Sequence, residues 1–288
     1  MSRREDILAR VGRTPSLPVA VVKAIPMLRD VNADLAEIAR VIRLDPGLAA
    51  NVLRLSNSAA LGARHKVSTL EAAVARLGSR RMMGLVLSST IGPMQCAPVR
   101  GYDLDRGALW RHAAAVGIAT RALLDLLGRK PAPHAETAAL LIDTGKMVLG
   151  LDLEVDGRAI ARRAYESNTP FEQAEREVLG IDHAEVGAAL LRHWGLPEEL
   201  VQVTRWHHEP TRCPTEHREV VDLVHAADQL CTLCGIGAGL DGCQYLPCQE
   251  TLTSLGLSEE VFDRALCRVV EGLQEADELF EKPLAGSK

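Results

Sequence analysis

The chain has 288 residues, 47% of them hydrophobic, and its 33 basic and 38 acidic residues give a net charge of −5. This composition excludes an intrinsically disordered chain and leaves no overall positive field that would attract nucleic acid or an anionic membrane surface. We therefore expect neither nucleic acid nor a membrane as a partner. Because a single core tends to split beyond roughly 250 residues, we expect two lobes.

The start of the chain and its cysteines predict a cytoplasmic protein. Residues 1–6 are mostly charged, and no apolar stretch of signal-peptide length follows them. The apolar runs fall far short of the roughly 18 residues that a membrane-spanning helix needs. Seven cysteines are an odd number in a chain that is large enough to fold without disulfides, which fits a reducing compartment.

The sequence pattern predicts an all-α fold. Aromatic residues make up only 3% of the chain, period-two runs are scarce, and Ala, Leu, Glu and Arg recur at spacings of three and four. Asp45–Pro46 and Thr169–Pro170 each offer an N-cap followed by proline at the first helical position. The expected helices, in chain order, cover residues 18–30, 34–44, 46–61, 69–77, 79–90, 105–128, 134–150, 157–167, 171–179, 183–194, 198–206, 216–235 and 259–280.

A break between lobes is expected near residues 92–101. This stretch carries two prolines and two glycines between helical segments. We therefore predict an N-terminal helical lobe over residues 1–97 and a second helical lobe, with the C-terminal helices, over residues 98–288.

A series of short motifs occurs in a fixed order along both lobes. The matching stretches are 17–18, 32–39, 42–48, 55–59, 67–73, 76–78, 140–149, 183–197 and 206–210. Their order resembles the HDOD family, bacterial signalling proteins whose name means HD-related output domain, over about two-thirds of the chain. The resemblance implies a two-lobed helical bundle whose second lobe is like an HD domain.

The resemblance also implies the place of a degenerate metal site. HD-domain phosphohydrolases, to which the HDOD family is related, hold metal with a histidine, an adjacent His-Asp pair and a later aspartate, and the metal activates water. His112 resembles the first histidine and Asp228 the later aspartate, but Ile142–Asp143 stands where the pair would fall. Because a hydrocarbon side chain cannot ligate a metal, Ile142 removes one ligand.

Three further histidines extend the implied pocket. His183 opens an expected helix, and His207 and His208 follow another, in positions that resemble the additional ligands of two-metal HD enzymes. The predicted pocket therefore comprises His112, Asp143, His183, His207, His208 and Asp228. The alternative is a buried hydrogen-bonded network without metal, in which Lys146 pairs with Asp143.

A second candidate metal site lies among the late cysteines. Cys231, Cys234, Cys243 and Cys248 have C-x2-C-x8-C-x4-C spacing, and four thiolates can close a tetrahedral structural zinc site. The glycine-rich stretch 235–239 could supply a turn between two ligand pairs. The competing interpretation is that Cys231 and Cys234, three apart on one helix, are small buried residues.

These observations lead to three functional hypotheses. The leading one is a noncatalytic cytoplasmic signalling module without a cofactor, which binds a protein partner of a signalling pathway; a small nucleotide is an alternative ligand. The second is a metal-dependent phosphohydrolase that retains a modified site, with water beside Ile142. The third is an interaction protein stabilised by zinc. Fold kinship alone does not decide among them.

Overall fold

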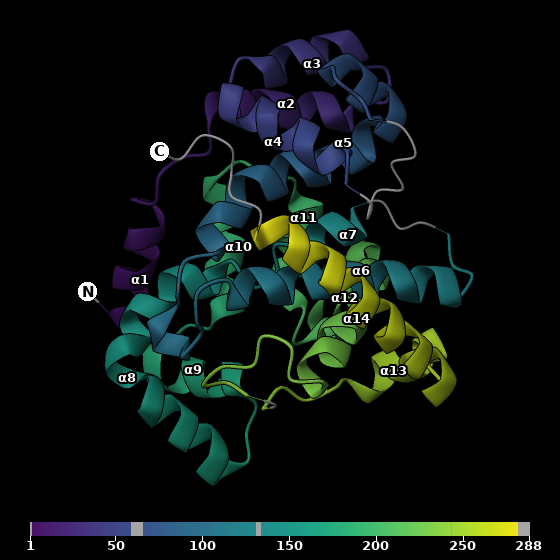
Figure 1. Ribbon diagram of the computed structural model, residues 1–288. Coiled ribbons are helices and arrows are strands. Elements are labelled where there is room, and N and C mark those ends of the chain that lie inside the picture. The colour runs from purple at the N-terminus through teal and green to yellow at the C-terminus, as the bar shows by residue number, and fades with distance from the viewer. Residues whose placement is uncertain (1, 59–65, 131–133, 243, 282–288) are drawn as a thin grey trace. The chain divides into compact units, whose positions relative to one another are not determined.

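The structure is a computed structural model that describes residues 2–58, 66–130, 134–242 and 244–281 (Figure 1). Within these residues the regular secondary structure is helical, and one isolated β-bridge joins Val99 to Leu104. The all-α prediction is confirmed. The elements are α1 (Arg3–Val11), α2 (Val19–Arg29), α3 (Leu35–Arg43), α4 (Pro46–Ser56), α5 (Leu70–Gln95), the 3-10 helix η2 (Arg100–Tyr102), α6 (Ala108–Leu126), α7 (Ala135–Ala139), α8 (Gly145–Ser167), α9 (Phe171–Leu179), α10 (His183–His193), α11 (Glu198–Trp206), the 3-10 helix η3 (Pro210–Arg212), α12 (Thr215–Leu233), α13 (Gln249–Leu255) and α14 (Glu259–Glu281).

The chain divides into two compact units. One contains the residues up to Ser16 together with Met94–Arg268, and the other contains Leu17–Pro93 and the chain from Val269 onward. The first division, which follows α1, was not predicted. It arises because α1 packs against α8 and α10 and so belongs to the larger unit. The second division falls within residues 92–101.

Helix-end chemistry shapes the smaller unit. The Asp45 side chain accepts a hydrogen bond from the backbone N–H of Leu48 at 3.0 Å, and Pro46 occupies the first turn of α4, as predicted. At the other end of α4, the Asn57 side-chain amide bonds both backbone groups of Val67. Short polar residues thus fix where this helix begins and where the chain returns.

Several helix boundaries differ from the sequence-based prediction. The expected helix 134–150 is interrupted between α7 and α8 by a turn over residues 140–144, and α8 then continues to Ser167. The α9 helix begins at Phe171 with Pro170 as its N-cap, so Thr169 does not cap it. The two helices α1 and α13 were not predicted. For α1 the signal was present, because Ser2 and Glu5 form a reciprocal capping box.

The larger unit brings the ends of several helices together around the 140–144 turn. Helices α6 and α12 pack along each other, as do α8 with α10 and α10 with α11. The starts of α8 and α10 approach each other closely at Gly145, where an added Cβ would overlap the carbonyl oxygen of His183. Glycine therefore allows the start of α8 to lie against the start of α10. Among the described residues, no helix combines the length and apolar character needed to cross a bilayer.

Candidate functional site

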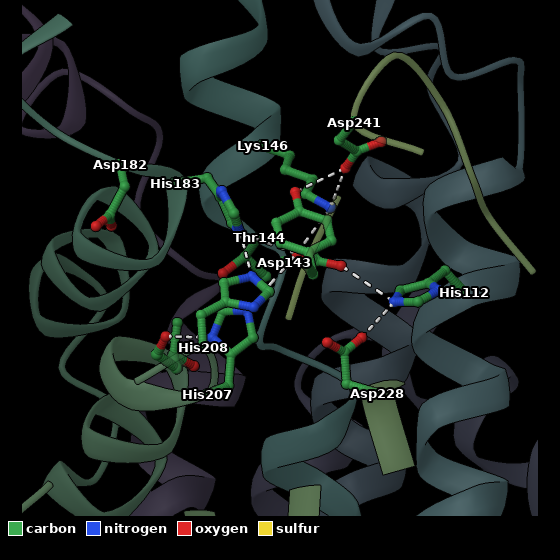
Figure 2. Close-up of polar contacts among 12 residues, drawn as sticks. His112, Asp143, Thr144, Lys146, Asp182, His183, His207, His208, Asp228 and Asp241 are labelled. Carbon is green, nitrogen blue, oxygen red and sulfur yellow. Dashed lines mark hydrogen bonds and ion pairs between the residues drawn. The ribbon is translucent and has the colours of Figure 1, made fainter. Parts of the chain in front are cut away.

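Six polar side chains meet inside the larger unit (Figure 2), contributed by α6, the 140–144 turn, α10, the end of α11 and α12. They are the six pocket residues predicted from the sequence. Potential ligand atoms lie within 4.8 Å of one another in two groups, which are Asp143, His183, His207 and His208, and His112, Asp143 and Asp228. Because Asp143 belongs to both groups, the turn that carries it is the centre of the site.

Asp143 is a buried carboxylate surrounded by nitrogen atoms. Its Oδ1 lies 3.2 Å from Lys146 Nζ, 3.6 Å from His183 Nε2 and 4.0 Å from His207 Nε2. Its Oδ2 lies 3.4 Å from His112 Nε2. Burial would raise the pKa of Asp143, but the charges of Lys146 and the histidines outweigh burial and hold this pKa well below its usual range. Asp143 is therefore an anion in the folded protein.

His112 has one ring nitrogen committed to the backbone. Its Nδ1 lies 2.7 Å from the carbonyl oxygen of Ile236, which can only accept, so Nδ1 carries a hydrogen. Its Nε2 lies 2.9 Å from Asp228 Oδ1 and also faces Asp143. Burial lowers the pKa of His112, but the hydrogen bond and charge of Asp228 raise it overall. The Nε2 position between two carboxylates suits either a proton or a metal cation.

His183 is oriented by a carboxylate that the sequence-based prediction missed. Glu175 on α9 is fully buried, and its Oε2 accepts from the ring Nδ1 of His183 at 2.7 Å and from the backbone N–H of His183 at 3.0 Å. Tyr102 donates its hydroxyl to the other oxygen of Glu175. This arrangement leaves His183 Nε2 facing the pocket, 2.9 Å from His208 Nε2. The only signal for Glu175 in the sequence is that an acidic residue falls on the helix face that is otherwise buried.

Three buried atoms of the pocket lack a hydrogen-bond partner. They are Asp143 Oδ1, Asp228 Oδ2 and His207 Nε2, although Asp143 Oδ1 also forms the ion pair with Lys146. The His207 Nδ1 atom donates to the carbonyl oxygen of Thr204 at 2.8 Å, so its Nε2 carries the lone pair. Burial lowers the pKa of His207 to about 4. One carboxylate oxygen without a partner, a second that has only the Lys146 ion pair, and a neutral imidazole nitrogen fit a divalent transition metal.

A loop closes this site, and we call residues 236–245 the covering loop; residue 243 lies outside the described residues. Lys146 donates to Asp241 Oδ2 at 2.9 Å, and Tyr245 also donates to that oxygen at 2.8 Å. The Tyr245 ring stacks on His208, with centroids 4.3 Å apart and an interplanar angle of 4°. A Cβ at Gly237, whose φ is +73°, would overlap the side chain of His112. The glycines let the loop lie directly on the pocket.

The space that remains under the covering loop is small. The cavity between the pocket residues and the loop has a volume of about 10 Å³, close to what a single water molecule needs. Ile142, in the position of the missing histidine, is fully buried. The enclosed site has room for an ion, but in this conformation it has none for a phosphoester substrate.

The three late cysteines that the structure describes do not form a comparable group. Cys231 is buried, Cys234 is exposed and Cys248 is half-buried. These three do not appear together in any group of close potential metal ligands within the described chain, and Cys243 lies outside the described residues. Burial also raises the pKa of the Cys231 thiol well above its usual value, which disfavours the thiolate that zinc requires. Gly237 and Gly239 of the glycine-rich stretch lie in the covering loop.

Comparison with known families bears on this arrangement. The family model of the HDOD domain matches residues 14–210, which is more than half of the chain. The chain belongs to the HDOD family. This confirms the resemblance in motif order, and it places the chain in a family related to HD phosphohydrolases.

Solved structures share the fold. An HDOD domain protein of unknown function from Geobacter sulfurreducens is 25% identical, with a TM-score of 0.71, over 96% of this HDOD chain and 99% of that one. A protein from Shewanella amazonensis SB2B, provisionally described as a phosphohydrolase, is 24% identical with a TM-score of 0.67 over 95% and 97%. A provisionally described signal transduction protein from Marinobacter aquaeolei VT8 is 23% identical with a TM-score of 0.68 over 97% and 65%. The last two likenesses establish the fold alone.

Curated relatives are longer proteins. An uncharacterized protein of Treponema pallidum is 26% identical over 224 residues, which make up 77% of this chain and 43% of that protein. Ribonuclease Y of Thermus thermophilus is 34% identical over 132 residues, which make up 46% of this chain and 21% of that enzyme. The HDOD chain thus spans less than half the length of these relatives.

Proposed function

We propose that this HDOD chain is a noncatalytic signal-transduction module of the cytoplasm, and that its degenerate HD site holds the larger unit together instead of turning over a substrate. The observation that carries the proposal is the closure of the site. Lys146 is paired with Asp143 on the 140–144 turn and with Asp241 on the covering loop, and the space between the pocket and the loop is about 10 Å³. The module acts by binding a protein partner of a signalling pathway or a small ligand.

The chemistry of the closed site supports this proposal. Hydrolysis of a phosphoester on a metal requires that the ester reach the metal and that water attack it. Here the carboxylate of Asp241 already engages the ammonium group of Lys146, and Tyr245 covers His208. Ile142 further removes one member of the ligand set that an HD enzyme uses. Opening the site would break a buried ion pair, which is costly.

The ligand atoms that remain fit a bound divalent metal. His112, Asp143 and Asp228 would hold one ion, and Asp143 with His183 and His207 would hold another. When bound, such a metal would supply charge to the three atoms that have no hydrogen bond, which are Asp143 Oδ1, Asp228 Oδ2 and His207 Nε2. The chain's own residues orient the ligands, because Glu175 fixes the ring of His183.

The second candidate function is metal-dependent phosphoester hydrolysis by the modified site. The observation that favours it is that each of the gathered side chains keeps a ligand atom within 4.0 Å of another ligand's atom despite the loss at Ile142. It requires the covering loop to move away from the pocket. In that case Lys146 would contact the substrate phosphate, and the metal would activate water.

A direct assay separates the two functions. The full chain, loaded with Mn²⁺ or Fe²⁺, is incubated with p-nitrophenyl phosphate, its diester, a cyclic dinucleotide and single-stranded RNA. We expect no product above that of the Asp143→Asn variant, with both proteins shown to be folded. Metal-dependent turnover that is lost in Asp143→Asn would overturn the noncatalytic proposal and establish the second function.

A further inference from the structure

Asp241 is a carboxylate of the covering loop that lines the pocket and reaches Lys146 (Figure 2). It is 2% exposed, and its Oδ2 accepts from Lys146 Nζ at 2.9 Å and from the Tyr245 hydroxyl at 2.8 Å. Its Oδ1 accepts from the backbone N–H of Gly239 at 3.2 Å. An ammonium group, a hydroxyl and a backbone N–H are donors that proteins also offer to free oxyanions. The carboxylate of Asp241 is thus held as a bound oxyanion would be.

Lys146 has a carboxylate partner even without Asp241. Asp143, on the turn before α8, lies 3.2 Å from the same ammonium group, so Asp241 is a second anion on one cation. A divalent ion in the pocket changes the balance of charge, because the ion and Lys146 together exceed the charges of Asp143 and Asp228 by one. One more anion then balances the pocket. In the closed structure the covering loop supplies it.

The covering loop is held on the pocket by few side chains. The described residues between Leu233, where α12 ends, and Gln249, where α13 begins, form no helix or strand, and connections of this length usually have a functional role. The buried residues of the loop are Ile236, Asp241 and Tyr245, and its other described residues are at least partly exposed. The only charged group among the three is Asp241, so the charged contact of the loop with the pocket is made there.

Two backbone hydrogen bonds tie the covering loop to elements beside the pocket. Leu240 donates its N–H to the carbonyl oxygen of Tyr102 at 2.6 Å, and the carbonyl oxygen of Gln244 accepts from the N–H of Phe171 at 3.1 Å. Phe171 is the first residue of α9, where the N–H has no partner within its own helix. Hydrogen exchange at the Phe171 amide therefore reports whether the loop is in place.

We propose that Asp241 is an autoinhibitory contact, whose carboxylate occupies the position on Lys146 that an incoming small oxyanion would take, and that an oxyanion which replaces it releases the covering loop. One anion is exchanged for another, so Lys146 keeps its partners and the cost of breaking the buried ion pair is avoided. The inference rests on the proposed function, because it concerns the regulation of the same closed site.

The test uses inorganic phosphate as the probe and two neutral variants of the full chain, Asp241→Asn and Asp241→Ala. Phosphate is titrated into each protein by calorimetry in the presence of equimolar Mn²⁺. We expect both variants to bind phosphate at least about tenfold more tightly than the parent chain, because no internal carboxylate competes for Lys146. Asp263→Ala removes an exposed carboxylate from the larger unit, and it should bind phosphate as the parent chain does.

Hydrogen exchange at the Phe171 amide follows the loop directly. In the parent chain, excess phosphate should raise the exchange rate of this amide. Tyr245→Phe removes one hydrogen bond to Asp241 while every charge stays in place, and it should raise the rate by roughly tenfold without phosphate. The amide of Ile160, buried within α8, is the internal control and should keep its rate in both experiments.

Two results would overturn the inference. One is that folded Asp241 variants bind phosphate no more tightly than the parent chain, or no more tightly than Asp263→Ala. If neither Asp241 variant folds, an unchanged Phe171 exchange rate in Tyr245→Phe and in the parent chain with phosphate overturns it instead. Either result leaves Asp241 as a structural partner of Lys146. Turnover in the assay above would overturn the noncatalytic function alone, so the two proposals can fail separately.

Discussion

Lys146 Nζ lies 2.9 Å from Asp241 Oδ2 and 3.2 Å from Asp143 Oδ1, so one buried cation joins the turn that carries the central ligand to the loop that covers it. The three side chains are at most 6% exposed. Burial alone would lower the pKa of Lys146, but the two carboxylates raise it above its usual value. Lys146 is therefore an ammonium ion in the folded protein.

Replacing Lys146 by methionine should destabilise the fold strongly. The substitution keeps the length of the side chain but leaves Asp143 and Asp241 buried without their cation. Removing one partner of a buried pair costs about 3–5 kcal/mol of unfolding free energy, which urea denaturation measures. The control is Arg192→Ala, which breaks the exposed pair with Glu198 and should cost less than about 1 kcal/mol. A similarly small loss in Lys146→Met would show that the buried pair is not a structural link.

The close approach of α8 and α10 predicts the effect of a single methyl group. In Gly145→Ala the new Cβ would meet the carbonyl oxygen of His183, so the two helices must separate. We expect the unfolding free energy to fall by about 1–3 kcal/mol. Gly117→Ala is the matched control, because its Cβ would lie 3.5 Å from Leu140 Cδ2, an ordinary contact, and alanine favours the helix. Equal stability of the two variants would contradict the packing described for Gly145.

Glu175 should act on metal affinity through His183. In Glu175→Gln the amide keeps the shape of the side chain but weakens the hold on the His183 ring, and such changes typically lower metal affinity about 10–100-fold. Titration with Co²⁺, followed by its visible absorption, measures both affinity and coordination. Glu177→Gln on the same helix, where Glu177 pairs with Arg163, should leave the titration unchanged. If Glu175→Gln binds Co²⁺ like the parent chain, the carboxylate does not position this ligand.

The sequence predicted the pocket more completely than it predicted how the pocket is closed. His112, Asp143 and Asp228 stand in a family pattern whose order survives in the sequence, and each is placed by a helix or a turn beside it. The covering loop could not be predicted, because the Lys146–Asp241 contact joins residues 95 positions apart and its glycines also suit an ordinary turn. From the sequence alone, the glycine-rich stretch therefore suggests a turn between cysteines.

Helix boundaries show the same division between local and distant causes. Asp45–Pro46 marked the start of α4 correctly because an N-cap acts within four residues. The turn before α8 was missed, because the local hydrophobic pattern does not show it, and the contact with α10 at Gly145 joins residues far apart in the sequence. Glu175 was missed for a related reason. Nothing adjacent in the sequence tells a buried polar side chain from a solvated one on a helix.

Glu172 should make stability depend on pH near neutrality. This side chain on α9 is 5% exposed, and its Oε2 has no hydrogen-bond partner. Burial raises its pKa to about 7 from a usual 4.5, against the smaller opposing influence of its backbone hydrogen bond and of His183 and Arg176. Below pH 4.5 the group is protonated in both the folded and the unfolded chain. Between pH 4.5 and 7 only the folded chain keeps the proton, so its contribution to stability falls as the pH rises.

The variant Glu172→Gln removes this titration. Relative to the parent chain, its unfolding free energy should rise between pH 4.5 and pH 7 and then level off, with a total gain of about 3 kcal/mol because each pKa unit corresponds to about 1.4 kcal/mol. Urea denaturation at a series of pH values measures the difference. Glu177→Gln is the control of opposite sign, because the hydrogen bond from Arg163 lowers the pKa of Glu177 and its removal should lower stability slightly above pH 4.5. A difference between Glu172→Gln and the parent chain that does not change with pH would mean that Glu172 ionises normally in the folded protein.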